Sequence, residues 1–215
     1  MNKLTGVILK PLEQSVYVKP HTMFYTQNGM EKSWDLLTIH DSVSVIIYNI
    51  TRNVLVLVKQ FRPAVYLGNI PESDRNEAID TNKYPAELGV TLEMCAGIVD
   101  KELPLEEVAA EEVLEECGYS VEASNLERVA SYLSGVGATS SRQTSYYCEV
   151  TDDMKVSQGG GVDDEIIEVV EMTIPDIKKY VSQNHVLSPP SFLFNIHWFL
   201  HNKVKDSKYI SNLIS

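Results

Sequence analysis

One short helix constrains the fold of this chain more than any other feature of its sequence. Pro104 suits the first position of a helix and Gly118 suits the left-handed residue that ends one, so a helix is predicted over 104–117. At about 100° per residue, its apolar residues gather on one side, at Ala110, Val113, Leu114 and Cys117. Such a side must be covered, and a sheet is the expected partner.

Segments of strand length lie on both sides of this helix in the sequence. Strands are predicted over 43–49, 55–60, 90–96, 126–133, 142–150 and 165–173, with further helices over 175–183 and after Ser188-Pro189-Pro190. Ahead of them, Gln27-Asn28-Gly29 predicts a hairpin turn between 23–25 and 33–39. The predicted fold class is therefore α/β (α+β), a mixed sheet with a few helices.

Two polar segments are predicted as loops. Residues 71–87 form a stretch long enough to be a functional or disordered insertion. Residues 154–164 contain Gly159-Gly160-Gly161, which predicts a mobile loop. Asp163, Asp164 and Glu165 follow these glycines directly, so carboxylates are expected at the end of the second loop.

Charge and cysteine content exclude several classes of protein. The formal net charge of −12 argues against a nucleic-acid partner, which requires a basic surface. The three cysteines are far apart and form no CxxC pair, which indicates reduced thiols rather than a disulfide framework or a zinc ribbon. No apolar segment follows the first residues, and the apolar runs are too short to cross a bilayer. We therefore expect a cytoplasmic protein with no membrane partner.

The chemistry concentrates in three carboxylates of the predicted helix. Glu112, Glu115 and Glu116 fall within about one third of its circumference. Each like-charged pair costs about 0.2–0.5 kcal/mol, and the last helical turns disfavour anions further. Divalent cations would relieve both penalties, and ligands that offer only oxygen indicate Mg²⁺ or Mn²⁺. A solvated helix face or a protein-interaction face remains the alternative.

The frame around these acids resembles the Nudix box, whose consensus ends in Arg-Glu-U-x-Glu-Glu-x-Gly-U with U apolar. Two positions depart from it, because Leu103 replaces the first Glu and Glu111 replaces the Arg that helps to orient the metal-binding carboxylates in the family. The positions that match are Gly97, Glu112, Val113, Glu115, Glu116 and Gly118.

The resemblance extends beyond the box to the branch of the family that cleaves nucleoside diphosphate sugars, above all the animal enzymes that act on UDP-glucose. It is carried by Lys59-Gln60-Phe61-Arg62-Pro63, Leu92-Glu93-Met94-Cys95-Ala96-Gly97 and Lys32-Ser33-Trp34-Asp35. It implies a Nudix α/β/α sandwich with a mixed sheet over 41–215. An antiparallel β portion over 1–40 would precede it and contribute to a homodimer and to the substrate site.

The same resemblance implies a reaction and a set of site residues. Mg²⁺-dependent hydrolysis would convert UDP-glucose to UMP and glucose 1-phosphate, with Arg62 clamping the diphosphate. Glu165 would act as general base, with Asp163 and Asp164 as alternatives, and Trp34 would stack on the base from a partner subunit. The implied metal ligands are Glu112, Glu115, Glu116 and the Ala96 carbonyl, and Glu93 and Gly137 are expected to line the substrate cleft.

Three alternatives stay open from the sequence. The substrate could be ADP-ribose or another ADP-sugar, because the base pocket is not legible. The departures at Leu103 and Glu111 would suit a non-catalytic module that only binds nucleotide. His197 and His201 have zinc-ligand spacing, but no third ligand accompanies them, and surface histidines are expected there.

Overall fold

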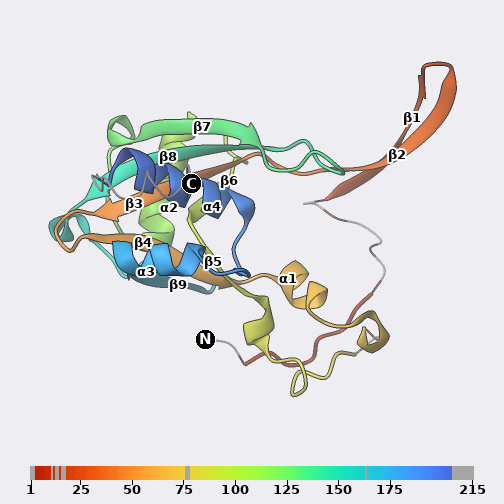
Figure 1. Cartoon of the computed structure of the whole chain (residues 1–215), viewed down its shortest axis with the longest axis horizontal. Coiled ribbons are helices and arrows are strands. Elements are labelled where there is room, and N and C mark those ends of the chain that lie inside the picture. The colour runs from red at the N-terminus through yellow and green to blue at the C-terminus, as the bar shows by residue number, and fades with distance from the viewer. Residues whose placement is uncertain are drawn as a thin grey trace.

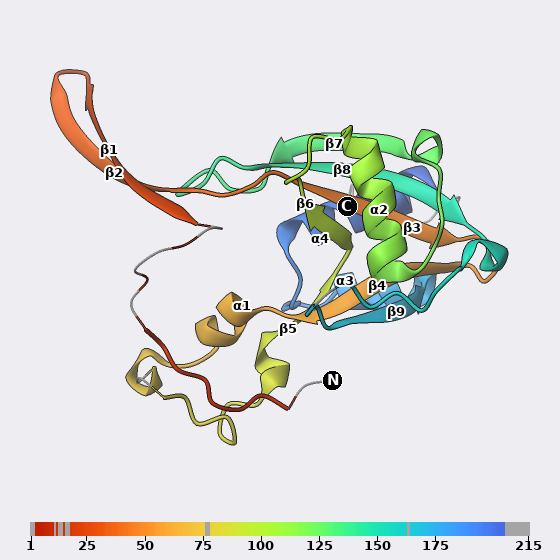
Figure 2. The same ribbon diagram turned by 180° about the vertical axis from the view of Figure 1, so that it is seen from behind.

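The computed structural model describes residues 3–10, 12, 15, 18–75, 78–162 and 164–204. It confirms the predicted α/β class: a two-stranded sheet stands beside a seven-stranded mixed sheet that has helices on both faces (Figures 1 and 2). No helix in the described part of the chain is long and apolar enough to cross a membrane. The strands are β1 (Lys19–Gln27), β2 (Met30–Thr38), β3 (Ser42–Asn49), β4 (Val54–Phe61), β5 (Val90–Glu93), β6 (Cys95–Ile98), β7 (Glu127–Leu133), β8 (Arg142–Val150) and β9 (Ile167–Thr173); the α-helices are α1 (Pro63–Gly68), α2 (Leu105–Cys117), α3 (Ile174–Val181) and α4 (Pro190–Asn202).

The large sheet opens in its middle, and this opening positions the site. β3 and β4 pair directly over only Ile47–Asn49 and Val54–Val56. Beyond that point β5 continues along β4 and β6 continues along β3, with Met94 as the residue between them. The outer edge of β4 carries β9, and the outer edge of β3 carries β8 in parallel and then β7. The predicted single strand over 90–96 is therefore two strands that belong to different halves of the sheet.

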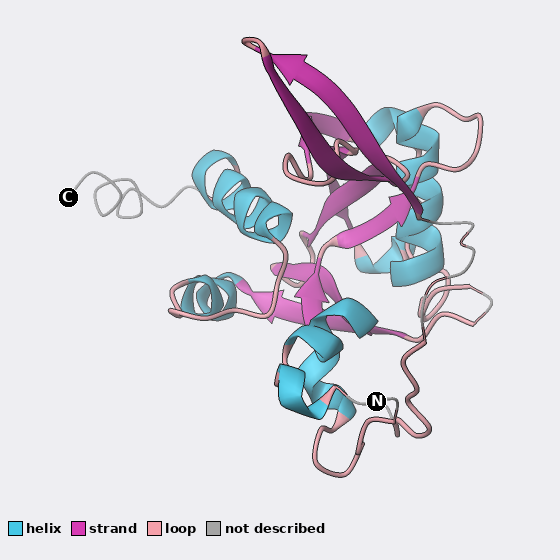
Figure 3. Ribbon diagram, turned by 90° about the vertical axis from the view of Figure 1, so that its right-hand side faces the viewer, coloured by secondary structure: helices cyan, strands magenta, loops and turns pink. Residues whose placement is uncertain are grey.

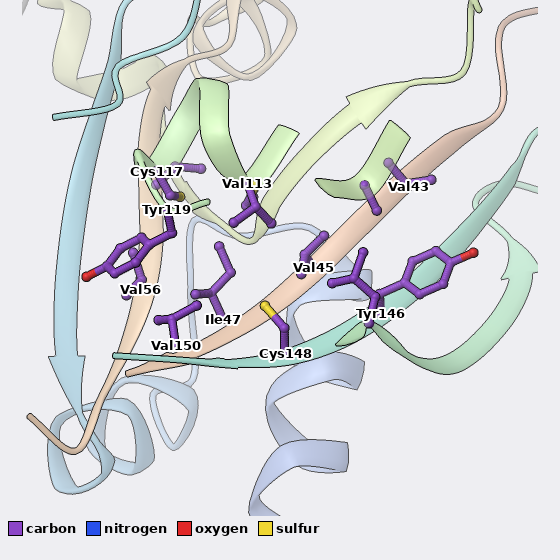
Figure 4. Close-up of a cluster of buried hydrophobic side chains, with 14 of the residues drawn as sticks. Val43, Val45, Ile47, Val56, Val113, Cys117, Tyr119, Tyr146, Cys148 and Val150 are labelled. Atoms are coloured by element: carbon purple, nitrogen blue, oxygen red, sulfur yellow. The ribbon is translucent and has the colours of Figure 1, made fainter. Parts of the chain in front are cut away.

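Alternating side chains divide the sheet into two apolar faces. Val43, Val45 and Ile47 of β3 point toward α2 and pack with Val113 and Cys117 of that helix (Figure 4). The opposite face is covered by α3 and α4, as the view from the side shows (Figure 3). Helix packing also corrects one expectation, because Leu114 of α2 is exposed whereas Val108 and Ala109 are buried.

The predicted hairpin extends away from the body of the molecule (Figure 1). Asn28 and Gly29 both have positive φ, of 53° and 80°, as a two-residue hairpin turn requires. Several large apolar side chains on it are exposed, among them Phe24 at 81% and Trp34 at 53%. In this structure the hairpin therefore leaves an apolar surface open to solvent.

The segment 71–87 is not a disordered insertion in its described residues. Its Ile79 is buried in a small third cluster with Tyr66 of α1 and Ile70, and Val7 packs against the same cluster. The backbone of Ile79 donates to the Val7 carbonyl at 3.0 Å. Residues near the start of the chain thus pack on the body, and only β1 and β2 form the projecting hairpin. The helix α1 was not predicted either, because six residues give too short a pattern.

Candidate active site

A cavity of about 700 Å³ lies where the large sheet opens. Met94, at the crossing from β5 to β6, lines it, and side chains reach it from both faces of the sheet. Its charged lining residues are Arg62, Glu93, Glu112, Glu116 and Glu165, and its other lining residues are Ser42, Ser44, Gln60, Met94, Ala96, Gly97, Ile98, Tyr132, Leu133, Ser134, Gln143, Pro189, Pro190, Ser191 and Phe194.

Glu116 enters the cavity from the last turn of α2 and is almost completely buried. Its Oε2 accepts a hydrogen bond from the Ala96 backbone N–H at 3.0 Å. Burial raises the pKa of Glu116 to about 8, and the nearby charge of Glu112 adds to the increase. Desolvation disfavours the charged form of a carboxylate that is buried in this way, so the ionised side chain destabilises the folded state unless a cation compensates it.

Glu112 lies one turn earlier and rests against Gly97 of β6. A side chain at Gly97 would begin 1.8 Å from Oε1 of Glu112, so only glycine leaves room for the carboxylate here. Burial raises the pKa of Glu112 to about 7, with further contributions from the charges of Glu115 and Glu165. The glycine of the predicted motif therefore serves as a cradle for an acid of the helix.

The end of α2 is held by the glycine loop. Gly118 ends the helix with a φ of 77°, as predicted. The N–H of Gly160 donates to the Glu116 carbonyl at 2.9 Å, and that of Gly161 donates to the Glu115 carbonyl at 3.1 Å. Gly159 approaches so closely that an added Cβ would lie 2.2 Å from the Glu116 carbonyl oxygen. The loop thus satisfies carbonyls that the helix leaves open, and it fixes the turn that carries Glu116.

Glu115 and the two atypical positions lie at the edge of the site. Glu115 is half-buried and does not line the cavity, although its charge raises the pKa of Glu112. Glu111, in the place of the family's Arg, forms an ion pair with Lys101 at 2.6 Å. The charge of Lys101 acts against the raised pKa of Glu112. A cation therefore stands near the carboxylates despite the substitution, while Leu103 is exposed ahead of the helix.

Arg62 and Glu93 form a two-pronged ion pair inside the cavity. Nε and Nη2 of Arg62 donate to the two carboxylate oxygens of Glu93 at 2.8 and 2.7 Å. Burial opposes ionisation of Glu93, but the hydrogen bonds and charge of Arg62 outweigh it and hold the pKa of Glu93 below its ordinary value. The pairing uses the edge of the guanidinium formed by Nε and Nη2, so Nη1 takes no part in it.

Glu165 lines the cavity at the end of the glycine loop. Its carboxylate accepts from the Val162 N–H at 3.2 Å, and its charge raises the pKa values of Glu112 and Glu116. Asp164, the alternative acid, is exposed and does not line the cavity. Asp163 lies outside the described residues.

Trp34 and Gly137 meet each other, but neither lines the cavity of this chain. The Trp34 indole Nε1 donates to the Gly137 carbonyl at 2.8 Å, and the Leu37 N–H donates to the Ala138 carbonyl at 2.7 Å. The loop between β7 and β8 therefore holds the base of the hairpin. Within its own chain, Trp34 therefore contacts this loop and not the cavity.

One side of the cavity was not anticipated from the sequence. Tyr132 of β7, Gln143 of β8 and Phe194 of α4 line it together with Ser42 and Ser44 of β3. No local motif marks these residues, because they come from four separate elements. The one available signal was Phe194 itself, an aromatic residue on a helix whose other aromatic residues form the core.

Comparison with known proteins identifies the family. No protein-family model matches the chain. The chain is 43% identical to uridine diphosphate glucose pyrophosphatase NUDT14 of Bos taurus, over 93% of this chain and 95% of the relative. It is 40% identical to the mouse protein of the same name, over 95% and 97%. A GDP-mannose pyrophosphatase of Cronobacter sakazakii is 29% identical over 73% and 72%. With the matching positions of its acidic helix, this similarity shows that the chain belongs to the Nudix hydrolase family.

Proposed function

We propose that this protein hydrolyses the pyrophosphate bond of a nucleoside diphosphate sugar and converts UDP-glucose to UMP and glucose 1-phosphate. The observation that carries the proposal is the meeting of Glu112, Glu116 and Arg62 in one cavity. Acids that favour a cation and a guanidinium that favours phosphate oxygens are together suited to a diphosphate. The names of the bovine, mouse and bacterial relatives, all pyrophosphatases of nucleotide sugars, support the substrate class.

The proposed cofactor is Mg²⁺, with Mn²⁺ as a substitute, held by Glu112, Glu115, Glu116 and the Ala96 carbonyl. The residues fit such an ion, because Gly97 leaves room beside Glu112, and Glu112 and Glu116 have raised pKa values that a cation would lower. Among the described residues, no three acidic, histidine or cysteine side chains already converge on one point. When bound, the metal would neutralise diphosphate charge and acidify a water molecule.

The chain's own residues would divide the remaining work. Glu165 would take a proton from the water whose oxygen attacks phosphorus, and the bond to the bridging oxygen would break in line with that attack. Arg62 would bind a diphosphate oxygen through the edge that faces the cavity. Glu93 would position Arg62, because its two hydrogen bonds fix the plane of the guanidinium.

Substrate choice tests the proposal directly. We expect kcat/KM for UDP-glucose to exceed that for ADP-ribose at the same Mg²⁺ concentration. Both compounds carry the diphosphate, so discrimination must come from the base and sugar ends, where unpaired polar groups reject a wrong ligand. A comparable or inverted ratio would assign the protein to the ADP-sugar enzymes, and binding without release of a monophosphate would make it a nucleotide-binding module.

Gly97 offers a second test, on the acid cradle. Gly97→Ala should displace the Glu112 carboxylate and weaken Mg²⁺ binding about tenfold or more, because the added Cβ would lie 1.8 Å from Oε1. Gly137→Ala is the matched control, since nothing lies within 4 Å of its added Cβ. Titration calorimetry with Mg²⁺ measures both variants. Equal Mg²⁺ affinities of the two variants would show that the position of Glu112 beside Gly97 does not matter for metal binding.

The projecting hairpin supports a homodimer in which residues 1–40 contribute to the interface and to the substrate site, ahead of a hydrolase domain over 41–215. Its exposed apolar side chains need a partner, and a second copy of the chain would place Trp34 beside the neighbouring cavity to stack on the base. Sedimentation velocity should show a dimer for the wild type and a monomer for Phe24→Glu. A monomeric wild type would contradict the proposal.

We also propose a cytoplasmic location. Cys95, Cys117 and Cys148 are all buried, and none of them forms a disulfide. Free thiols of this kind are compatible with a reducing compartment.

A further inference from the structure

We propose that the wall of the cavity formed by β3, β7, β8 and α4 binds the hexose of the nucleotide sugar, with Ser42, Gln143 and Phe194 in contact with it. This inference rests on the proposed function. It names the part of the site that selects the sugar, which neither the motif nor the metal ligands specify.

Charge separates the two sides of the cavity. All five charged lining residues come from the end of β4, from β5, from α2 and from the loop before β9; they are Arg62, Glu93, Glu112, Glu116 and Glu165. The side formed by β3, β7, β8 and α4 contributes only neutral groups to the lining. A diphosphate held at the charged side therefore has its uncharged substituents beside a neutral wall.

The neutral wall contains an ordered chain of hydrogen bonds. The Tyr132 hydroxyl donates to Oε1 of Gln143 at 3.0 Å, and this uses its one proton. Ser145 must therefore donate to the Tyr132 oxygen at 2.9 Å, which in turn requires Ser44 to donate to Ser145 at 2.8 Å. The direction of every bond in this series is fixed by the carbonyl of Gln143.

The Gln143 end of the chain offers groups to a ligand, because Gln143 and Ser42 both line the cavity. Nε2 of Gln143 donates to the Ser42 hydroxyl at 3.2 Å, so one amide proton of Gln143 and the hydroxyl proton of Ser42 are not used in these bonds. At the other end, Nδ2 of Asn195 donates to Ser44 at 3.3 Å. Oδ1 of Asn195 is buried and has no hydrogen-bond partner among the described residues. Asn195 does not line the cavity, so this oxygen lies behind the wall, and the free donors that face the cavity are those of Gln143 and Ser42.

Phe194 supplies the apolar component. It is 42% exposed although its neighbours Asn195 and Ile196 are fully buried, and it lines the cavity. Its ring and that of Tyr132 form an edge-to-face pair, with centroids 5.1 Å apart and planes at 68°. The hydrogen bonds of Tyr132 therefore fix the position of both rings and of the Gln143 amide.

A hexose matches this combination better than a base does. Its hydroxyl groups each donate and accept, like the serine and amide groups of the wall, and its C–H face suits an aromatic ring. A base presents a fixed order of donors and acceptors along one edge and needs a flat slot. The wall instead offers separate hydrogen-bonding groups from Ser42 and Gln143, beside the Phe194 ring. This arrangement suits the non-planar ring of a hexose.

The test compares two sugars and two nucleotides. For wild type, Gln143→Ala, Phe194→Ala and Tyr132→Phe, kcat/KM is measured with UDP-glucose, UDP-galactose and ADP-glucose. The glucose-to-galactose ratio should change roughly tenfold in the Gln143 and Tyr132 variants, as for loss of one hydrogen bond to a ligand. Phe194→Ala should lower kcat/KM for both sugars, and all three variants should leave the UDP-to-ADP ratio unchanged. His201→Ala, exposed on the same helix and outside the cavity lining, is the control.

Thermal unfolding identifies any variant that fails to fold, and Tyr132→Phe is the variant least exposed to this problem because it keeps the ring. A changed UDP-to-ADP ratio with a constant sugar ratio would overturn the inference and place the base at this wall. Constant ratios in all variants would also overturn it. If the wild type cleaves none of the three compounds, the proposed function fails, and calorimetric affinities for the two UDP-sugars then give the same test of the wall.

Discussion

Glu116→Gln is expected to lower kcat on the order of 10³-fold at saturating Mg²⁺ while the chain stays folded. The carboxylate is buried beside Glu112 and held by the Ala96 N–H. A metal that bridges a diphosphate supplies several kcal/mol of charge stabilisation, and each factor of ten in rate corresponds to about 1.4 kcal/mol. Glutamine keeps the shape and the hydrogen bond to Ala96 but removes the charge. Glu107→Gln, an exposed position on the same helix, is the matched control. Near wild-type turnover in Glu116→Gln would show that this carboxylate is no metal ligand.

The same variant should be more stable than the wild type when no metal is present. The pKa of Glu116 is about 8 in the folded chain against an ordinary value of 4.5, so the folded state keeps a proton that the unfolded state releases. Protonated Glu116 therefore contributes its full share to the free energy of unfolding below about pH 4.5. That contribution is lost as the pH rises toward 8. At pH 7 the loss is on the order of 3 kcal/mol. Urea unfolding in EDTA at pH 5 and pH 8 measures it. The stability advantage of Glu116→Gln should grow with pH, and lower stability at both pH values would make Glu116 a structural residue.

Arg62→Ala should lower kcat/KM for UDP-glucose roughly 30-fold to 1000-fold, which corresponds to a loss of about 2–4 kcal/mol of transition-state binding. The guanidinium is held by Glu93 at 2.7 and 2.8 Å, so its open edge is oriented before substrate binds. Arg62→Lys should recover only part of the loss, because a point charge cannot bridge Glu93 and a phosphate oxygen together. Activity of Arg62→Ala equal to wild type would place Arg62 outside the site.

Arg62→Ala also leaves the buried carboxylate of Glu93 without its partner, and this effect must be separated from the loss of the clamp. The double variant Arg62→Ala, Glu93→Gln removes the orphaned charge. It should recover thermal stability relative to Arg62→Ala but not kcat/KM. Recovery of kcat/KM in the double variant would mean that the single variant failed through distortion around Glu93, and that Arg62 does not clamp the substrate.

The sequence by itself determined the features that depend on local signals. Asn28 and Gly29 accept the positive φ values of a hairpin turn, so the hairpin was predictable from two residues. Gly118 ended α2 as predicted for the same reason, and the helical spacing of Glu112 and Glu116 already placed both acids on one side. Within a single helix, separation along the chain fixes separation in space.

Only the tertiary structure decided which distant residues meet. The pairing of Arg62 with Glu93 follows from β5 lying along β4, and the contact of Gly97 with Glu112 follows from α2 packing beside β6. Trp34 was expected to reach the substrate site of a partner subunit; within its own chain it contacts Gly137 of the loop between β7 and β8.

The neutral wall is the clearest case of this limit. Its hydrogen bonds join Ser44 to Ser145 and Asn195 to Ser44, residues more than 100 positions apart. Serine, glutamine and asparagine carry no periodic signal, and strand register and helix docking alone bring them together. These depend on burying apolar side chains such as Ile46 and Phe192 on the same face of the sheet. The packing of the apolar core therefore determines where the polar side chains of the neutral wall lie. The residues next to them in the sequence do not.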